Sequence, residues 1–381
     1  MFHINGHNFN ASYGVVPKSV LAYQTSLSLE CETNPYLWFT ETYQQRLAVT
    51  KKRLAPYLGA DDSDFVFVDN STSAANSVFN SLSFDEDSVI IVLQTVYGVI
   101  KNLVSKQRCR VVTIPVDVMH LDRLKHSVNE KIAEVHGNVA LVCVDHIASA
   151  PGILLPVADI STVCKSYGVP VLVDGAHALG QVRVDLGELA ASGVTYWFTD
   201  AHKWFFSPKG SALLWVHKHR QPHVRPAIDC AYIASRRCEC QTFAERFEYL
   251  GTKDYTPWLA VSSAIDFVEA MGGYSCLIDR NRKLALWSRD FLSVRLNSTN
   301  TVDDAVTVSM CNVHLPEITN QTAADSLHRF LRERNMEVIV CEHPSEVFWL
   351  RLCAQIFVTK SSIQDLWVQL QAFFAKTRDT R

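Results

Sequence analysis

The chain has 381 residues, enough for two domains that share an interface, and its 48% hydrophobic and 20% charged residues are typical of a globular protein. The net charge of −3 gives no basic field for nucleic acid, and no apolar run reaches the ~18 residues that a membrane span needs. The first residues lack the charged and apolar regions of a secretory signal, so we expect a cytoplasmic protein.

Apolar runs of strand type alternate with helical stretches after the N-terminal arm. A helix is expected near Lys18–Gln24, and a second helical pattern runs from Tyr43 to Leu58 and ends near Gly59. This alternation is typical of βα units and predicts an α/β fold with a mostly parallel sheet. Its strands are expected at Phe65–Val68, Ser88–Leu93, Val111–Ile114, Val139–Val144, Val171–Val173, Tyr196–Phe198 and Ala212–Val216.

The last third of the chain predicts a smaller α+β domain. The stretch 222–249 is irregular, and a helix at Trp258–Ala270 begins the second region. Met336–Val340 and Val347–Leu352 are interpreted as strands of that region. We therefore divide the chain into a large domain at 15–250 and a small domain at 251–381, to which the arm 1–14 belongs.

Two predicted strand ends carry the residues that say most about function. Asp174 follows the strand Val171–Val173, and Lys203 lies just beyond the strand Tyr196–Phe198. Parallel strands bring both groups to the carboxyl edge of the sheet, where open α/β sheets bind ligands. A lysine there can form a Schiff base, and a carboxylate can keep a pyridinium nitrogen protonated. That pair is what a protein contributes to pyridoxal phosphate (PLP) chemistry.

Both residues also have a simpler interpretation. Lys203 could be a solvated surface lysine, but its aromatic neighbours Phe198 and Trp204 favour a buried amine with a lowered pKa. Lys209 is the alternative Schiff-base lysine, although it lies in a Ser-Pro-Lys-Gly turn pattern. Asp174 could instead cap a helix that follows its strand.

A candidate phosphate site precedes these residues in the chain. Small hydroxyl residues, among them Thr72 and Ser73, lie between the strand Phe65–Val68 and a helical pattern. Such residues suit a helix N-cap, and the free amides of a helix N-terminus also make an anion site. Upstream of an Asp…His-Lys pair, we interpret Thr72 and Ser73 as ligands of a phosphate group.

The 11 cysteines are scattered, as expected of reduced thiols in a cytosolic enzyme. The close pair Cys238 and Cys240 lacks a second pair or histidines at zinc spacing. We therefore expect no metal site.

The motifs around these residues resemble the class V aminotransferase family, the fold-type I PLP enzymes that include cysteine desulfurases and isopenicillin N epimerase. The resemblance is closest to the epimerase-like and carbon–sulfur lyase branch, and it covers nearly the whole chain. The fold it implies is a large PLP domain with a mostly parallel sheet and a smaller α+β C-terminal domain. The motifs that carry it are Phe9–Gly14 with Pro17, Val173–Gln181, His202–Trp204 with Ser207–Ala212, and Leu250–Asp254 with Ala264–Phe267.

The resemblance implies further contacts with the cofactor. His177 stands where the desulfurases carry a glutamine that contacts the cofactor phenolate, as a donor or as an acceptor. Tyr97 would stack on the pyridine face, unless it is a half-buried core tyrosine. Ser149 matches a polar position near the phenolate, and His202 would contact the phosphate. Relatives carry Ser or Asn where this chain has Asp200, and we expect that carboxylate to turn away, because it would repel a phosphate.

One further residue is assigned to substrate binding, and another is assigned to a contact with a second subunit. Arg351 lies inside an apolar strand, where an unpaired cation is costly. The resemblance makes it the residue that binds the substrate carboxylate, and an internal salt bridge is the alternative. Thr252 resembles the residue by which a partner subunit completes the phosphate site, which implies a homodimer with shared active sites.

The resemblance implies an enzyme in which Lys203 removes the α-proton of an amino acid. We prefer a carbon–sulfur lyase that acts on cysteine or an S-substituted cysteine. An epimerase, an aminotransferase and a non-catalytic PLP-fold binding protein stay as alternatives. Cys341 lies in the region of the desulfurase nucleophile but lacks the segment that precedes it, so we interpret it as a core residue.

Overall fold

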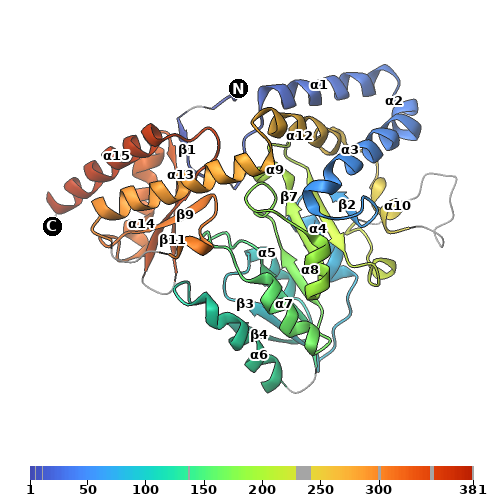
Figure 1. The fold of residues 1–381 in the computed structure, drawn as a ribbon, viewed down its shortest axis with the longest axis horizontal. Coiled ribbons are helices and arrows are strands. Elements are labelled where there is room, and N and C mark those ends of the chain that lie inside the picture. The colour runs from blue at the N-terminus through green and yellow to red at the C-terminus, as the bar shows by residue number, and fades with distance from the viewer. Residues whose placement is uncertain are drawn as a thin grey trace.

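The fold is built on a seven-stranded sheet, and a smaller sheet lies beside it (Figure 1). The computed structural model describes residues 1–4, 6–10, 12–135, 138–228, 242–298, 302–343 and 347–379. In the large sheet the strand order is β2-β8-β7-β6-β5-β3-β4, and only β8 runs against its neighbours. The strands are β2 (Phe65–Val68), β3 (Val89–Leu93), β4 (Arg110–Ile114), β5 (Val139–Asp145), β6 (Val171–Asp174), β7 (Val194–Asp200) and β8 (Ala212–Val216).

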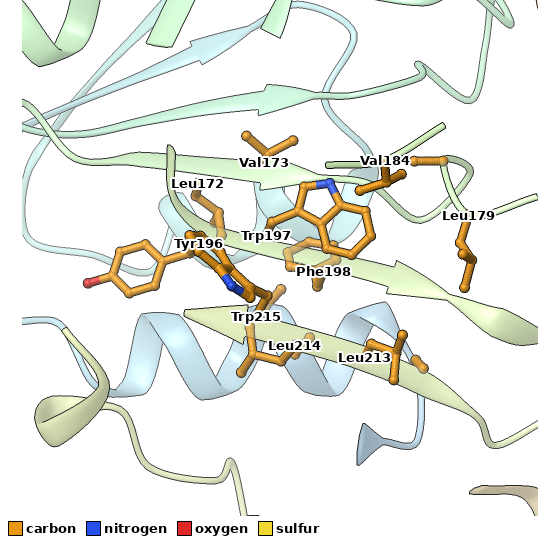
Figure 2. Packing of buried hydrophobic residues seen from close by; sticks show 14 of the residues in the cluster. Leu172, Val173, Leu179, Val184, Tyr196, Trp197, Phe198, Leu213, Leu214 and Trp215 are labelled. Carbon is orange, nitrogen blue, oxygen red and sulfur yellow. The ribbon is translucent and has the colours of Figure 1, made fainter. Parts of the chain in front are cut away.

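The centre of this sheet is apolar on both faces because helices cover it. Every residue of β6, β7 and β8 is buried, as expected of strands that face protein on both sides. Figure 2 shows Trp197 and Phe198 of β7 between side chains of β6 and β8. Here α4 packs on β7 and β8, and α7 packs on β5 and β6. This rigid layer fixes the positions of the residues at the strand ends.

Helices follow most of the strands, which gives the alternation expected from the sequence. The first helix is longer than predicted, and the predicted helix at Trp258–Ala270 is divided in two. The helices are α1 (Lys18–Thr33), α2 (Pro35–Leu37), a π-helical turn (Trp38–Thr42), α3 (Tyr43–Leu58), α4 (Ser71–Asn80), α5 (Gly98–Val104), α6 (Leu124–Glu134), α7 (Val157–Ser166), α8 (Leu186–Ser192), α9 (Ala201–Trp204), α10 (Phe243–Glu248), α11 (Thr256–Leu259), α12 (Val261–Ala270), α13 (Tyr274–Arg295), α14 (Gln321–Arg332) and α15 (Lys360–Asp379).

The C-terminal part forms a second layer around a three-stranded antiparallel sheet, β11-β12-β9. Its strands are β9 (Met310–His314), β11 (Ile339–Glu342) and β12 (Phe348–Cys353), and they pack with α13, α14 and α15 around a separate buried cluster. The N-terminal arm joins this layer, because β1 (His7–Asn8) pairs with β10 (Met336–Glu337) and Phe9 is fully buried in the same cluster. In Figure 1 the C-terminus lies at the end of α15 on this side of the molecule, and the N-terminus lies at the top, beside the start of α1.

Two differences from the predicted strands have a physical cause. The single strand expected at Met336–Val340 is two strands, because β10 pairs with the N-terminal arm and β11 pairs with β12. Strand β9 was not predicted, since its Met-Cys-Asn-Val-His sequence has no continuous apolar run. Among the described residues, no helix is long and apolar enough to span a membrane.

Candidate active site

A cavity lies where three parallel strands end. Asp145 ends β5, Asp174 ends β6 and Asp200 ends β7, and all three carboxylates line a cavity of about 120 Å³. A second cavity of about 400 Å³ extends toward α14 and shares four lining residues with the first: Tyr97, Ser149, His177 and Lys203. Two larger hollows, of about 660 and 830 Å³, contain none of the predicted site residues.

Lys203 lies in this cleft and is paired with Asp200. Its Nζ is 3.0 Å from Oδ2 of Asp200, and only 16% of its side chain is exposed. The short helix α9 carries the lysine directly after β7, and Gln355 donates a hydrogen bond to its backbone oxygen over 3.1 Å. Lys209, the alternative lysine, instead donates to the backbone oxygen of Gly14 and lines neither cavity.

Asp174 and Asp145 form a buried pair of carboxyl groups. Asp174 accepts a hydrogen bond from the backbone of Ala176, and Asp145 accepts one from the Thr95 hydroxyl over 2.8 Å. Burial raises the pKa of Asp174 above its usual range, although the Ala176 amide and Lys203 oppose that shift. Burial and the neighbouring Asp174 also raise the pKa of Asp145. Sequence reasoning missed Asp145, although it ends a strand as Asp174 does.

The hydrogen bond from Trp204 fixes the tautomer of His177. The indole nitrogen of Trp204 donates to Nδ1 of His177 over 3.1 Å, so that nitrogen carries no proton. Burial, helped by the nearby Lys203, lowers the pKa of His177 well below its usual value, which keeps the ring neutral. The hydrogen of a neutral ring is then on Nε2. Nε2 is therefore the ring nitrogen of His177 that can donate a hydrogen bond.

The N-terminus of α4 forms one end of the smaller cavity. Asn70 caps the helix, because its Oδ1 accepts from the backbone of Ser73 over 2.8 Å. Thr72 and Ser71 line the cavity, and the buried Ser71 hydroxyl has no hydrogen-bond partner within the described chain. Ser73, which we predicted beside Thr72 as a phosphate ligand, is not part of the lining.

Asp200 faces the cavity, so the expectation that it turns away is wrong. Its Oδ1 accepts a hydrogen bond from the backbone nitrogen of Ser71 over 2.8 Å, while Oδ2 pairs with Lys203. The free amide of a helix N-terminus attracts a carboxylate as well as a phosphate.

Arg351 is a fully buried cation beside the cleft. Its Nη1 donates to the backbone and hydroxyl oxygens of Ser149, and its Nη2 donates to Oδ1 of Asn10 over 3.2 Å. Its Nε has no hydrogen-bond partner, and no carboxylate among the described residues forms an ion pair with it. The alternative of an internal salt bridge is therefore not found in the described chain. Ser149 and Asn10 line the cleft, whereas the arginine itself does not.

The remaining predicted residues lie at different distances from the cleft. Tyr97 lines both cavities with 57% of its surface exposed, so its ring is free to cover a ligand. His202 lines neither, and its Nδ1 is 3.0 Å from the backbone oxygen of Ser211. Thr252 is exposed, 3.1 Å from the Tyr249 hydroxyl, and is likewise not in the lining.

Cys341 lines neither cavity. Burial raises the pKa of Cys341 to about 11, so its sulfur is a protonated thiol at neutral pH. That protonation state does not suit a nucleophile. The pair Cys238 and Cys240 lies outside the described residues.

The residues present fit PLP on two counts. The cleft brings an amine, a buried carboxylate with a raised pKa, and a histidine donor to the same small cavity. At its other end, the unpartnered Ser71 hydroxyl and the α4 N-terminus provide donors for an anionic group. Lys203 and Asp174 would thus hold the reactive end of the cofactor, and Ser71 and Thr72 would hold its phosphate.

Comparison with known proteins adds an independent line of support. The sequence pattern of the family described as Aminotransferase class-V matches residues 7–362. A probable L-cysteine desulfhydrase from Arabidopsis thaliana is 26% identical, over 85% of this chain and 72% of the relative. The hercynylcysteine sulfoxide lyase of Schizosaccharomyces pombe is 24% identical, over 92% of this chain and 90% of the relative. The isopenicillin N epimerase of Streptomyces clavuligerus is 26% identical, over 95% and 93%.

Coverage differs between these relatives. For three further plant proteins named as desulfhydrases, this chain spans 58–63% of the relative's length. Among solved structures, the cystine C–S lyase C-DES in complex with cysteine persulfide has a TM-score of 0.79, at 20% identity over 96% of this chain and 97% of that one. At that identity the likeness concerns the fold, which agrees with the two layers described above.

Proposed function

Because the chain belongs to the class-V aminotransferase family, whose cofactor is PLP, we propose that it is a carbon–sulfur lyase that acts on cysteine or an S-substituted cysteine. The predicted fold type and cofactor are thus confirmed. The observation that carries the proposal is the position of Lys203 in a cavity with Asp174 and His177, beside the buried cation Arg351. The names of the desulfhydrase and sulfoxide lyase relatives support the choice of reaction.

Each residue has a distinct part in this proposal. When bound, PLP supplies the electron sink that stabilises the negative charge left at the substrate α-carbon. Asp174 holds the proton on the ring nitrogen, which strengthens that sink. His177 would donate a hydrogen bond from Nε2 to the cofactor's phenolate oxygen, and Tyr97 would lie against its ring.

Two basic side chains hold and deprotonate the substrate. Arg351 binds the substrate's α-carboxylate, and that carboxylate supplies the anion that this buried guanidinium lacks. Lys203 accepts the α-proton at Nζ, a role that requires the amine to give up its own proton first. Since Cys341 is a thiol, we propose that Cys341 does not take the sulfur and that the sulfur leaves as a free product.

We also propose a homodimer in a cytoplasmic setting. Thr252 is exposed and lies outside the cavity of its own chain, which suits a residue that reaches the phosphate site of a second copy. The plant relative named above carries the word chloroplastic in its name, so the compartment of this chain stays a prediction.

Product analysis tests the reaction. Purified protein with PLP would be given cysteine, cystine and S-methylcysteine sulfoxide, and pyruvate, ammonia and sulfur products would be measured. We expect pyruvate and ammonia in equal amounts from at least one of them, and none from the Lys203→Ala variant. Amino-group exchange with a keto acid, without pyruvate, would make the protein an aminotransferase.

Two alternatives have their own readouts. The epimerase reaction is favoured by the relative from Streptomyces clavuligerus, and it would appear as racemisation of an amino acid without pyruvate or amino-group exchange. A non-catalytic binding protein would show the visible absorbance of bound PLP but would exchange no α-proton in deuterated water.

A further inference from the structure

Asp200 occupies an anion site with its own carboxylate. The α4 amide of Ser71 lies 2.8 Å from Oδ1 of Asp200, and Asp200 is only 3% exposed. The unpartnered hydroxyl of Ser71, a residue that is 8% exposed, lines the same cavity. The donors that suit the phosphate of PLP are therefore partly used by a side chain of the protein itself.

The charge of Asp200 is balanced by a group that the cofactor needs. Lys203 Nζ forms its ion pair with Asp200 Oδ2, and the same amine is the one we assign to the cofactor's aldehyde. A lysine that has joined an aldehyde no longer offers a free ammonium group to Asp200. A phosphate dianion would then meet an uncompensated carboxylate in a buried cavity, where like charges repel strongly.

Within the part of the chain that the structure describes, no other group facing Asp200 removes this conflict. Asp174, on the neighbouring strand β6, adds negative charge, and Asp145 on β5 lies beyond it. His202, on α9, has Nε2 at 4.0 Å from Oδ2, but burial lowers its pKa, so the ring is mostly neutral. Lys209 lines neither cavity, and its amine is bound to Gly14.

We propose that Asp200 is an internal competitor for the phosphate of PLP, so that this chain binds the phosphorylated cofactor together with one proton. The proton is shared between the Asp200 carboxylate and the phosphate and comes from solvent. The site therefore selects the singly charged form of a phosphate ester. This inference rests on the proposed position of the cofactor and not on the reaction that follows.

The test compares PLP with pyridoxal, which lacks the phosphate. Dissociation constants of both would be measured on cofactor-free protein by tryptophan fluorescence between pH 6 and pH 8. The ratio of the two constants isolates the phosphate, because the chemistry at Lys203 is common to both ligands. The preference for PLP is this ratio of dissociation constants, and it depends on pH because one proton is taken up with PLP. Above the phosphate's second pKa of ~6, the preference should fall about ten-fold per pH unit, which amounts to about 100-fold by pH 8.

Asp200→Asn is the decisive variant. The asparagine keeps an oxygen that can accept a hydrogen bond from the backbone of Ser71, but it removes the negative charge. The preference of this variant for PLP should therefore exceed that of the wild type by about 100-fold at pH 8. It should also not change with pH. Asp69→Asn is the matched control, since Asp69 lies next to the α4 cap, pairs with Lys253 and does not line the cavity. This control should keep the pH dependence of the wild type.

Three results would overturn the inference. The first is that the wild type's preference for PLP does not change with pH. The second is that the Asp200→Asn variant has the same ratio of PLP and pyridoxal dissociation constants as the wild type. The third is that the Asp200→Asn protein is folded but no longer binds PLP. Calorimetry of the wild type in buffers with different heats of ionisation gives a second measurement that needs no variant. It should report about one more proton taken up with PLP than with pyridoxal. None of these readouts depends on whether the protein releases pyruvate.

Discussion

Asp145 and Asp174 lie opposite each other in the register of β5 and β6, so two buried carboxyl groups end neighbouring strands at one small cavity. The charge of Asp174 opposes the ionisation of Asp145, and burial opposes the ionisation of both groups. The pKa of each group is therefore higher than that of an isolated carboxyl group. Like any such pair, they titrate as a unit.

This pair predicts a loss of stability at high pH in the cofactor-free protein. The pKa of each carboxyl group is higher in the folded chain than the ~3.9 of an unfolded aspartate. The stability that the pair contributes is thus fully present below about pH 4 and is lost as pH rises through about 6 to 7. Asp145→Asn keeps an acceptor for Thr95 but removes one charge, so it should raise the melting temperature at pH 8 and leave it unchanged at pH 4.

Thermal melts of both proteins at several pH values would measure this effect. The gain at pH 8 should be on the order of 3 kcal/mol, which follows from a pKa shift of a few units. Equal melting temperatures at pH 8 would mean that the two carboxylates are both solvated there.

A second prediction concerns the lysine that binds the cofactor. Borohydride reduction of the PLP-loaded protein should fix the label on the peptide that contains Lys203, which lines the cavity. The matched control is Lys209→Ala, which removes an exposed amine six residues away and should keep both the label and turnover. Peptide mass spectrometry gives the answer, and a label on Lys209 would contradict the assignment.

A third prediction tests the role of Asp174 as the partner of the ring nitrogen. Asp174→Asn keeps an oxygen for the Ala176 amide, so the fold and most cofactor binding should persist. Exchange of the substrate α-proton in deuterated water should slow by roughly 100-fold or more, because a buried charge-assisted contact is lost. An exchange rate near that of the wild type would show that another acid protonates the ring.

A fourth prediction concerns the buried guanidinium. Arg351→Lys keeps the charge but loses the planar fork, so KM should rise by the equivalent of about 1.5–3 kcal/mol. Arg289→Lys is the control, because that buried arginine already pairs with Asp290 and Asp304. It should change stability but leave KM alone. Steady-state kinetics decide, and an unchanged KM in Arg351→Lys would place the carboxylate site elsewhere.

A fifth prediction tests for shared active sites. If Thr252 serves the partner's phosphate site, Lys203→Ala subunits mixed with Thr252→Val subunits should regain part of the activity that each lacks alone. The mixture contains some sites with both native residues, which explains the expected recovery. Analytical ultracentrifugation would give the oligomeric state, and a monomer that is active at high dilution would exclude this arrangement.

The fold and the cofactor residues were largely predictable because both follow from short local patterns. The strand β2 at Phe65–Val68, the strand β8 at Ala212–Val216 and the helix α3 have the predicted bounds. Lys203 and Asp174 meet at one cavity because parallel strands place their carboxyl ends together. The division at residue 250 and the roles of the site residues stay predictions.

The parts that could not be predicted depend on contacts between distant segments. The orientation of Asp200 is set by a helix amide 129 residues earlier in the chain. The tautomer of His177 is set by Trp204, whose indole the sequence does not place. The split at Val338 depends on pairing of β10 with the arm. Each of these needs three-dimensional neighbours that no local pattern contains.

The first ten residues connect two places that are far apart in the sequence. The backbone oxygen of Phe9 accepts from Cys353 at the end of β12, and the side chain of Asn10 holds Arg351 on the same strand. The arm is therefore bonded directly to the strand of Arg351, the residue that we propose as the substrate-carboxylate site. A peptide fused ahead of Met1, or a protease cut before Phe9, would loosen substrate binding while the large sheet and its lysine stay intact.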